Sequence, residues 1–280
     1  MNEYFVGLTT KTFSKVIKSG AITLEGVIRW AAANGFGWVE LRDSRLVLED
    51  VDLRKLGSIA SDSGLPLQYA WDGTNLLADS SHSLFARGLS KASQLPGARF
   101  CRVTIAGQVF KEDPARLGYT LDEAYRISCE VAREVRAAAR YGIALVFENS
   151  HEPLRGDGAQ CLGIRELLLQ IHDMNLAFDP ANFLSLKPPL RAPGWETLRS
   201  FYDEFSRRIP YVHLKSAGPG GFLPTMEIRS EREAACVYRM YREGKLICIE
   251  LPEVDDVDTG ARNILAAREA ITRAKEPYVE

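Results

Sequence analysis

The sequence lacks long apolar runs, blocks of like charge and an abundance of histidine. It has 280 residues with only 4 histidines, and no run approaches the roughly 18 apolar residues of a membrane span. Its 35 basic and 37 acidic residues give a formal net charge of −2, and no basic arm stands out. Because nucleic-acid binding needs a basic surface to neutralise phosphates, we expect neither nucleic acid nor a membrane as a partner.

Paired cysteines are also missing. The 5 cysteines are scattered, odd in number and without CxxC spacing, which indicates free thiols in a reducing compartment. The first residues, MNEYFVGLTT, show no positive region followed by an apolar stretch, so no signal peptide is expected. The sequence therefore predicts a cytoplasmic protein.

Short apolar runs alternate with longer helical patterns along the chain. Most of these runs, such as ALVF and LICI, are apolar throughout, which is typical of parallel strands covered on both faces. Eight strands are predicted, at Tyr4–Thr9, Gly37–Arg42, Pro66–Trp71, Phe100–Ile105, Ile143–Asn149, Leu176–Asp179, Tyr211–Lys215 and Leu246–Leu251.

Helical patterns fill the segments between these strands. Thr120–Tyr141 begins with Thr-Leu-Asp-Glu, which predicts a capping box. Thr23–Asn34 begins with a capping Thr and is followed by Gly35, a typical helix stop. Similar patterns predict helices at Arg45–Ser63, Ser80–Gln94, Gly163–Met174, Trp195–Arg207, Ser230–Glu243 and Thr259–Lys275.

Eight strand–helix units favour a closed α/β barrel, the (β/α)8 TIM barrel, over an open doubly wound sheet, which is the main alternative. No GxGxxG follows the first strand, so the dinucleotide-binding form of the open sheet loses support. The length is near the roughly 250 residues of one barrel, and no low-complexity linker divides the chain. We expect a single barrel domain spanning residues 1–280.

Four ionisable residues stand at the ends of four consecutive predicted strands: Glu148, Asp179, His213 and Glu250. In a barrel these ends meet at one mouth, where a lone buried charge is costly. Each acid taken singly could be a helix cap or a surface ion pair, but three crowded carboxylates repel one another unless a cation lies among them. Oxygen ligands with one imidazole suit Mn²⁺ best, with Mg²⁺, Co²⁺ or Zn²⁺ as alternatives, so the sequence predicts a divalent metal centre.

Other polar and aromatic residues at the strand ends are candidates for substrate binding. Glu40 and Arg42 either face the substrate or pair with each other or with a neighbouring loop. Lys215 either binds a substrate oxygen or balances the charge of a neighbouring carboxylate, and His151 is either a site residue or an ordinary loop histidine. The candidates are Glu40, Arg42, Trp71, His151, Asn182 and Lys215.

Several motifs carry a resemblance to a known family. GFGWVELR at 35–42, GIALVFEN at 142–149, LAFDPAN at 176–182, VHLK at 212–215 and ICIELP at 247–252 together resemble the xylose isomerase-like TIM-barrel superfamily, in its sugar phosphate isomerase/epimerase and ketose 3-epimerase branch. The resemblance covers nearly the whole chain. It implies that the four strand-end residues hold the metal and that Asn182 lies near the substrate. Ser216 departs from the Asp that many relatives have at that position.

The resemblance implies a metal-dependent isomerase or epimerase of a sugar or sugar phosphate. Glu148 or Glu250 then removes the proton next to a carbonyl to give a cis-enediolate, and the other glutamate returns a proton. Two alternatives remain open: a dehydratase of a keto-polyol with His151 as general acid, and a non-catalytic sugar-binding barrel. A homo-oligomer, dimer or tetramer, is compatible with the sequence.

Overall fold

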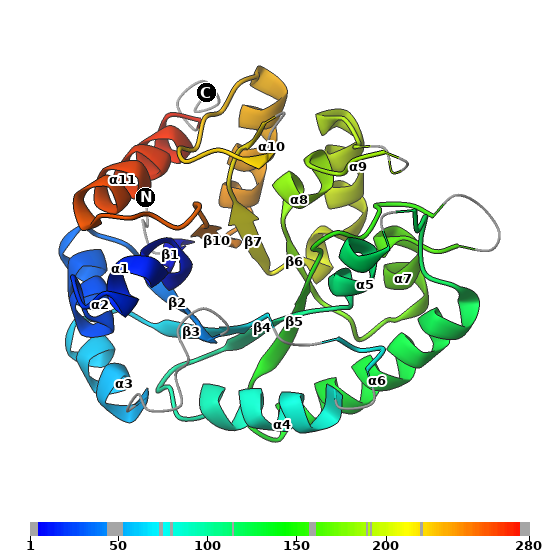
Figure 1. Ribbon diagram of the computed structural model, residues 1–280, viewed down its shortest axis with the longest axis horizontal. Helices are drawn as coiled ribbons and strands as arrows, with labels where there is room; N and C mark the ends of the chain where they lie inside the picture. Colours follow the sequence, from blue (N-terminus) through cyan, green and yellow to red (C-terminus); the bar gives the residue numbers. More distant parts are fainter. Residues whose placement is uncertain are drawn as a thin grey trace.

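The chain folds into a closed barrel of eight parallel strands surrounded by helices (Figure 1). The computed structural model describes residues 5–43, 53–72, 75–78, 81–113, 115–156, 161–188, 190, 192–218 and 221–274. The strand order around the barrel is β1, β10, β7, β6, β5, β4, β3, β2, and β1 pairs with both β10 and β2. This closure confirms the predicted TIM barrel and excludes the open sheet. A single domain spanning residues 1–280 extends beyond the described residues and stays a prediction.

Each barrel strand begins and ends within two residues of its predicted bounds. The strands are β1 Val6–Thr9, β2 Trp38–Arg42, β3 Leu67–Trp71, β4 Phe100–Thr104, β5 Ala144–Glu148, β6 Leu176–Phe178, β7 Tyr211–Leu214 and β10 Leu246–Ile249. Two further short strands, β8 Ala217–Gly218 and β9 Gly221–Phe222, form a separate antiparallel hairpin after β7.

Long helices follow the strands and cover the outside of the barrel. They are α2 Leu24–Ala33, α3 Leu53–Asp62, α4 Ser81–Ala92, α6 Leu121–Ala139, α7 Ile164–Gln170, α9 Trp195–Phe205, α10 Glu231–Arg242 and α11 Val257–Arg273. All eight were predicted, although residues 45–52, 80 and 275 of the predicted helices lie outside the described residues. Among the described residues, no helix is both long and apolar enough to cross a membrane.

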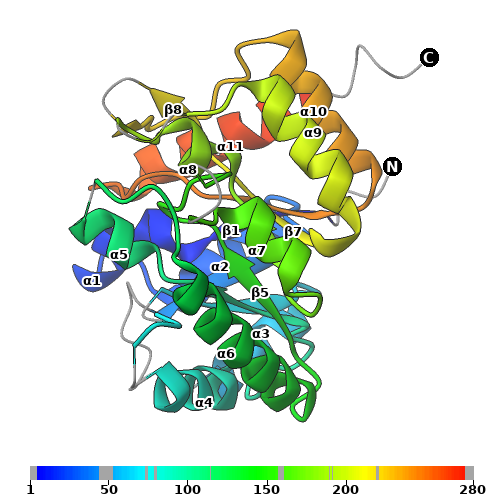
Figure 2. The same ribbon diagram turned by 90° about the vertical axis from the view of Figure 1, so that its right-hand side faces the viewer.

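Short helical segments that were not predicted occupy the connections. They are η2 Thr10–Phe13, α1 Ser14–Lys18, α5 Gly107–Glu112 and α8 Pro180–Leu184. The 3-10 turn η5 Ser206–Arg208 directly follows α9 and lies mostly within the helix predicted at Trp195–Arg207. Figure 2 shows α1, α5 and α8 toward the same end of the molecule as β8. Because α1, α5 and α8 lie in connections that leave the carboxyl ends of their strands, they surround the mouth where barrel enzymes carry their chemistry.

Helix caps and stops explain why the predicted ends of α2 and α6 were accurate, whereas α7 ends at Gln170, four residues before the predicted Met174. Thr120 accepts a hydrogen bond from the Glu123 amide, and the Glu123 carboxylate returns one to the Thr120 amide. Gly35 and Gly142 follow α2 and α6 with φ angles of 70° and 68°, which side chains with a Cβ rarely adopt. Local chemistry therefore accounts for these helix ends without reference to tertiary contacts.

The lower half of the barrel interior is filled with apolar and aromatic side chains. Trp38 and Tyr211 pack with their ring centroids 5.2 Å apart, and the Trp38 indole donates to the Phe5 carbonyl. A Cβ on Gly7 would lie 2.4 Å from the Trp38 ring, so only glycine fits opposite this indole. We call this layer the barrel floor; its members are Trp38, Val146, Ala177, Tyr211 and Cys248.

Candidate active site

The four predicted metal ligands lie directly above the barrel floor. Side chains on a strand alternate between its two faces, so a residue two positions after a floor residue also points into the barrel. The structure brings their ligand atoms within 4.8 Å of one another. Each ligand follows a floor residue by two positions: Glu148 follows Val146, Asp179 follows Ala177, His213 follows Tyr211, and Glu250 follows Cys248.

His213 lies at the centre of this group. Its Nδ1 is 2.7 Å from Glu148 Oε1 and 2.7 Å from Glu250 Oε2, and its Nε2 is 2.9 Å from Glu40 Oε2. Burial alone would lower the pKa of His213, but the three carboxylates raise the pKa well above 6.5. In the absence of a metal, the ring is therefore a buried imidazolium that links the carboxylates.

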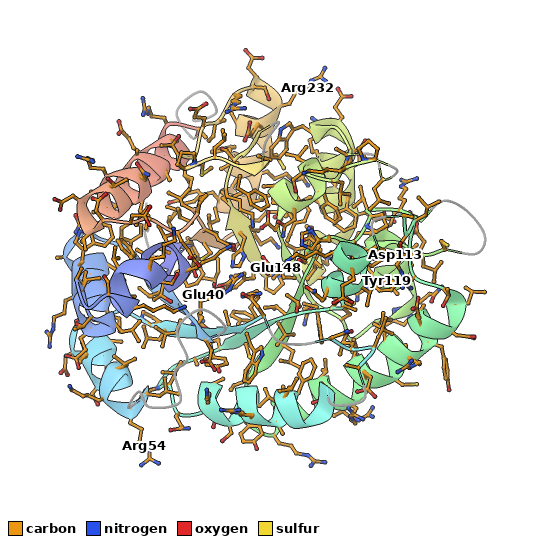
Figure 3. All side chains as sticks on the ribbon, in the orientation of Figure 1. Glu40, Arg54, Asp113, Tyr119, Glu148 and Arg232 are labelled. Carbon is orange, nitrogen blue, oxygen red and sulfur yellow. The ribbon has the colours of Figure 1, made fainter. Side chains whose placement is uncertain are left out.

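Glu40 lies beneath His213 rather than in the open mouth. Its carboxylate has no exposed surface, accepts from the Tyr211 hydroxyl and the Arg42 guanidinium, and contacts His213 Nε2. Burial would raise the pKa of Glu40, but His213 and Arg102 lower the pKa further than burial raises it. Contact between Glu40 and substrate stays an untested prediction; the geometry instead makes Glu40 the hydrogen-bond partner that orients the ring. Figure 3 shows Glu40 and Glu148 near the barrel centre, whereas Arg54 and Arg232 point outward.

Basic side chains lie against the two glutamates. Glu250 contacts Lys11 Nζ, lies 3.4 Å from Lys215 Nζ and lies 3.4 Å from Arg42 Nη1. Glu148 Oε2 accepts a hydrogen bond from Arg102 Nη1 at 2.6 Å. Burial would raise the pKa of both carboxyl groups, but the neighbouring positive charges lower the pKa of each, most strongly for Glu250. Both glutamates are therefore ionised in the absence of a metal.

Asp72 joins the two arginines. It accepts from Arg102 Nη2 at 2.6 Å and from Arg42 Nε at 2.8 Å. The ionisable residues at the mouth thus form one connected set, which we call the charge cluster: Lys11, Glu40, Arg42, Asp72, Arg102, Glu148, Asp179, His213, Lys215 and Glu250.

Lys11 and Arg102 are site residues that the sequence reasoning missed. Arg102 is fully buried on β4, in the otherwise mostly apolar strand FCRVT. A lone arginine in a covered strand was the available signal, because a buried guanidinium needs carboxylate partners. Lys11 lies in the short segment after β1, where nothing in TTKTF distinguishes it from a surface lysine.

Asp179 carries a buried oxygen without a hydrogen bond. Its Oδ1 caps α8 by accepting from the Asn182 amide at 3.1 Å. Its Oδ2 is 2.6 Å from Lys215 Nζ, but this ion pair does not have hydrogen-bond geometry, so Oδ2 accepts no hydrogen bond. Burial raises the pKa of Asp179, and Lys215 offsets part of that rise. A buried carboxylate oxygen that accepts no hydrogen bond is suited to bind a metal.

The four ligands fit a divalent cation. They supply three carboxylates and one imidazole, and the Nε2 of His213 contacts Glu40, as the second nitrogen of a metal-bound histidine usually contacts a carboxylate. Glu40, His213 and Cys248 form a second possible group deeper in the barrel. Burial raises the pKa of the Cys248 thiol to about 12, so the thiolate that binds metals is absent near neutral pH. The upper group therefore fits a metal better, provided Lys215 releases Asp179 Oδ2.

A pocket of about 280 Å³ opens above these ligands. Of the predicted substrate-binding residues, Arg42, His151, Asn182 and Lys215 line it. Trp71 is not among the lining residues: its ring packs against Gly88 of α4, with Lys91 Nζ 5.7 Å from its centroid. Unpredicted lining residues are Lys11, Asp72, Thr104, Gln108, Lys111, Ser150 and Phe222. We call this space the mouth pocket.

A larger cavity, of about 650 Å³, lies at the other end of the barrel. It is bordered by strand beginnings and turns such as Pro66, Pro96 and Leu246, and no member of the charge cluster lines it. Size alone would select this cavity, but chemistry requires ionisable groups that converge on the reacting atoms. The mouth pocket is therefore the candidate active site.

The connection after β7 forms one wall of the mouth pocket. Ser216 accepts a hydrogen bond from the Glu227 amide at 2.8 Å and donates one to the Glu227 carbonyl at 3.1 Å. These bonds close the loop that carries the β8–β9 hairpin. Phe222 on this hairpin lies with its ring centroid 4.4 Å from Lys215 Nζ. Ser216 thus anchors the wall and does not take part in the charge cluster.

Solved structures confirm the TIM-barrel fold, and those with similar folds include proteins described as xylose isomerase domain proteins and sugar epimerases. A xylose isomerase domain-containing protein from Salmonella typhimurium aligns over 99% of this chain and 98% of its own, with a TM-score of 0.60 and 15% identity. No protein-family model and no curated protein matches the sequence.

Individual enzymes with this fold are also similar to the chain. An L-ribulose 3-epimerase is 19% identical with a TM-score of 0.68, over 97% of this chain and 94% of that one. A probable 3-DHS dehydratase from Bacillus anthracis is 13% identical with a TM-score of 0.64, over 95% and 97%. At such identities the likeness establishes the fold, and the chemistry has to be argued from the residues.

Proposed function

We propose that this chain is a divalent-metal-dependent isomerase or epimerase of a small sugar or sugar derivative. The observation that carries the proposal is the convergence of Glu148, Asp179, His213 and Glu250, two of which, Glu148 and Glu250, line the mouth pocket. The epimerases of similar fold add support at the level of the scaffold. Mn²⁺ suits the donor set best.

The four converging residues would hold the metal, which when bound supplies a Lewis acid that polarises the substrate carbonyl. Glu148 and Glu250 both line the mouth pocket, so each can reach a proton next to that carbonyl. Glu250 forms ion pairs with Lys11, Lys215 and Arg42, all within 3.4 Å. Glu148 forms two, with Arg102 at 2.6 Å and with Arg42 at 4.0 Å, so Glu148 is the stronger base of the two. We therefore assign proton removal to Glu148 and proton return to Glu250.

Lys215 and Asn182 are placed to hold the substrate. Both line the mouth pocket, and Asn182 is fixed by donating its side-chain amide to the Asn149 carbonyl at 2.7 Å. Lys215 is held between Asp179 and Glu250, so both roles expected for this lysine are compatible: it balances charge at rest and reaches a substrate oxygen when a metal takes Asp179.

A dehydratase is the second candidate, because His151 lines the mouth pocket and one structure of similar fold is described as a probable dehydratase. Burial, Lys111 and Lys215 lower the pKa of His151, so its ring is neutral near pH 7. A neutral imidazole is a weak general acid for expelling a hydroxyl group. The electrostatics therefore favour isomerisation or epimerisation over loss of water.

The experiment that separates these functions uses solvent deuterium. The purified protein is assayed for bound metal, loaded with Mn²⁺ and incubated with a panel of ketoses and ketose phosphates in D₂O. Deuterium at the carbon next to the carbonyl, without loss of water and abolished by chelation, supports the proposal. Loss of water indicates the dehydratase. A protein that binds sugar without metal and without exchange would contradict both enzymatic functions.

A further inference from the structure

The charges around the mouth pocket are unbalanced once a metal is bound. Among the described residues, the charge cluster contains five carboxylates and four permanently basic side chains, together with His213. A histidine that binds a metal through one nitrogen is neutral. Without a metal the protonated His213 balances the cluster at zero net charge, and a divalent cation that replaces its proton changes the net charge of the cluster to one positive.

Lys111 adds a further positive charge at the rim. It lies on α5, is exposed and lines the mouth pocket. No ion pair or hydrogen bond is found for its ammonium group among the described residues. The positive charge of Lys111 helps to lower the pKa of His151, which lines the same pocket. Among the described residues that line the pocket, Lys11, Arg42 and Lys215 are held by carboxylates before a metal binds. Lys111 is available to a ligand at the rim without leaving a carboxylate first.

We infer that the substrate carries an anionic oxyacid group, a phosphate or a carboxylate, which Lys111 binds at the rim of the metal-loaded pocket. A neutral sugar would leave the excess positive charge uncompensated in a partly enclosed site of about 280 Å³. An anionic sugar neutralises it and places its carbonyl over the metal ligands. This inference rests on the proposed function and narrows its substrate class.

Binding, measured by calorimetry and separately from turnover, tests the inference. The ligands are D-fructose, D-fructose 6-phosphate and D-fructuronate, so that the two charged sugars distinguish a phosphate from a carboxylate. With Mn²⁺ present we expect at least one charged sugar to bind roughly tenfold more tightly than fructose, with a preference that weakens as salt is added. After chelation of the metal the preference should fall, because the net positive charge is lost.

Lys111→Gln and Lys55→Gln form a matched pair of variants. Lys55 is exposed on α3 and pairs with Glu25, outside the mouth pocket. We expect Lys111→Gln to reduce the preference for the charged sugar several-fold and Lys55→Gln to preserve it. Equal binding of neutral and charged sugars, equal effects of the two variants, or no binding of either charged sugar at millimolar concentration overturns the inference.

The same samples keep the inference separate from the proposed function. Deuterium exchange is followed for each sugar in parallel with its binding. Lys111-dependent binding of a charged sugar without exchange supports the anionic ligand and contradicts the isomerase. Exchange with fructose at least as fast as with both charged sugars supports the isomerase and contradicts the anionic ligand.

Discussion

The same strands build the floor and the mouth of the barrel, with the residues of the mouth two positions after those of the floor. The two layers differ in polarity, in charge and in what holds their side chains together. Trp38 and Tyr211 pack as rings on the floor, whereas Glu40 and His213, the next inward-facing residues of the same strands, pair as buried charges. Apolar burial stabilises the fold at about 25 cal/mol per Å², while buried ion pairs often contribute little net stability. The comparison teaches that the floor maintains the fold and that the mouth is retained for chemistry.

The largest expected effect is on catalysis at the mouth. Glu148→Gln removes the proposed base while keeping the shape of the side chain, so turnover should fall by about 10²–10⁴-fold. The measurement is the rate of solvent deuterium exchange at saturating Mn²⁺, with bound metal quantified in the same sample. Glu269→Gln, an exposed exchange of the same kind on α11, is the control and should retain the rate. Full activity of Glu148→Gln with metal bound would show that the assigned role is wrong.

The matching change on the floor should affect stability instead. Trp38→Ala removes a fully buried indole and its hydrogen bond to Phe5, so the free energy of unfolding should fall by about 3–5 kcal/mol. Denaturant titration measures this loss, and exchange below the unfolding transition should stay within a few-fold of the parent rate. If Trp38→Ala remained stable but lost its exchange activity, the division between floor and mouth would be incorrect.

The sequence predicts the strands of the barrel and some residues of the mouth, but not the contacts that these residues make. Apolar runs predicted the strands, and the position of Glu148, Asp179, His213 and Glu250 at the ends of four of them predicted that they meet at the mouth. The partners of these residues could not be predicted, because pairing across the barrel depends on strand stagger, which no local pattern encodes. Lys11 is therefore recognisable as a site residue only in the folded chain, and for Arg102 the sequence shows a lone arginine in an apolar strand but not its carboxylate partners.

The contacts of Glu40 could not be predicted from the sequence either. Its place at the end of a strand was sufficient to mark it as a site residue. Whether its carboxylate would face the substrate or His213 depended on depth within the barrel, and Glu40 lies one inward-facing position below Arg42. Spacing in the sequence predicts which face of a strand a side chain is on. How deep that side chain lies below the mouth is known only from the closed barrel.

The third prediction concerns this buried carboxylate. Glu40→Gln keeps a partner for His213 Nε2 but removes the negative charge that increases the basicity of the ring, so Mn²⁺ affinity should fall by about 10–100-fold. Calorimetric titration with Mn²⁺ measures the change without relying on turnover. Saturating metal should restore most of the exchange rate. An unchanged metal affinity would mean that Glu40 does not act through His213.

The smallest expected effect is on the pH dependence of stability. The free energy of unfolding should change differently with pH in the metal-free and in the Mn²⁺-loaded protein. Without metal, the pKa of His213 lies well above its unfolded value of about 6.5, so its stabilising contribution is complete below pH 6.5 and is lost as the pH rises. The free energy of unfolding can fall by up to about 1.4 kcal/mol per pH unit. Glu148 and Glu250 do not change it between pH 6.5 and 8, because their pKa values are lowered and both groups titrate near pH 4 and below. Metal binding requires a neutral ring, so saturating Mn²⁺ should flatten or reverse this slope. Thermal unfolding of the chelated and Mn²⁺-loaded protein across pH 6.5–8 checks this expectation. Parallel pH profiles for the two forms would mean that the metal does not replace the proton on His213.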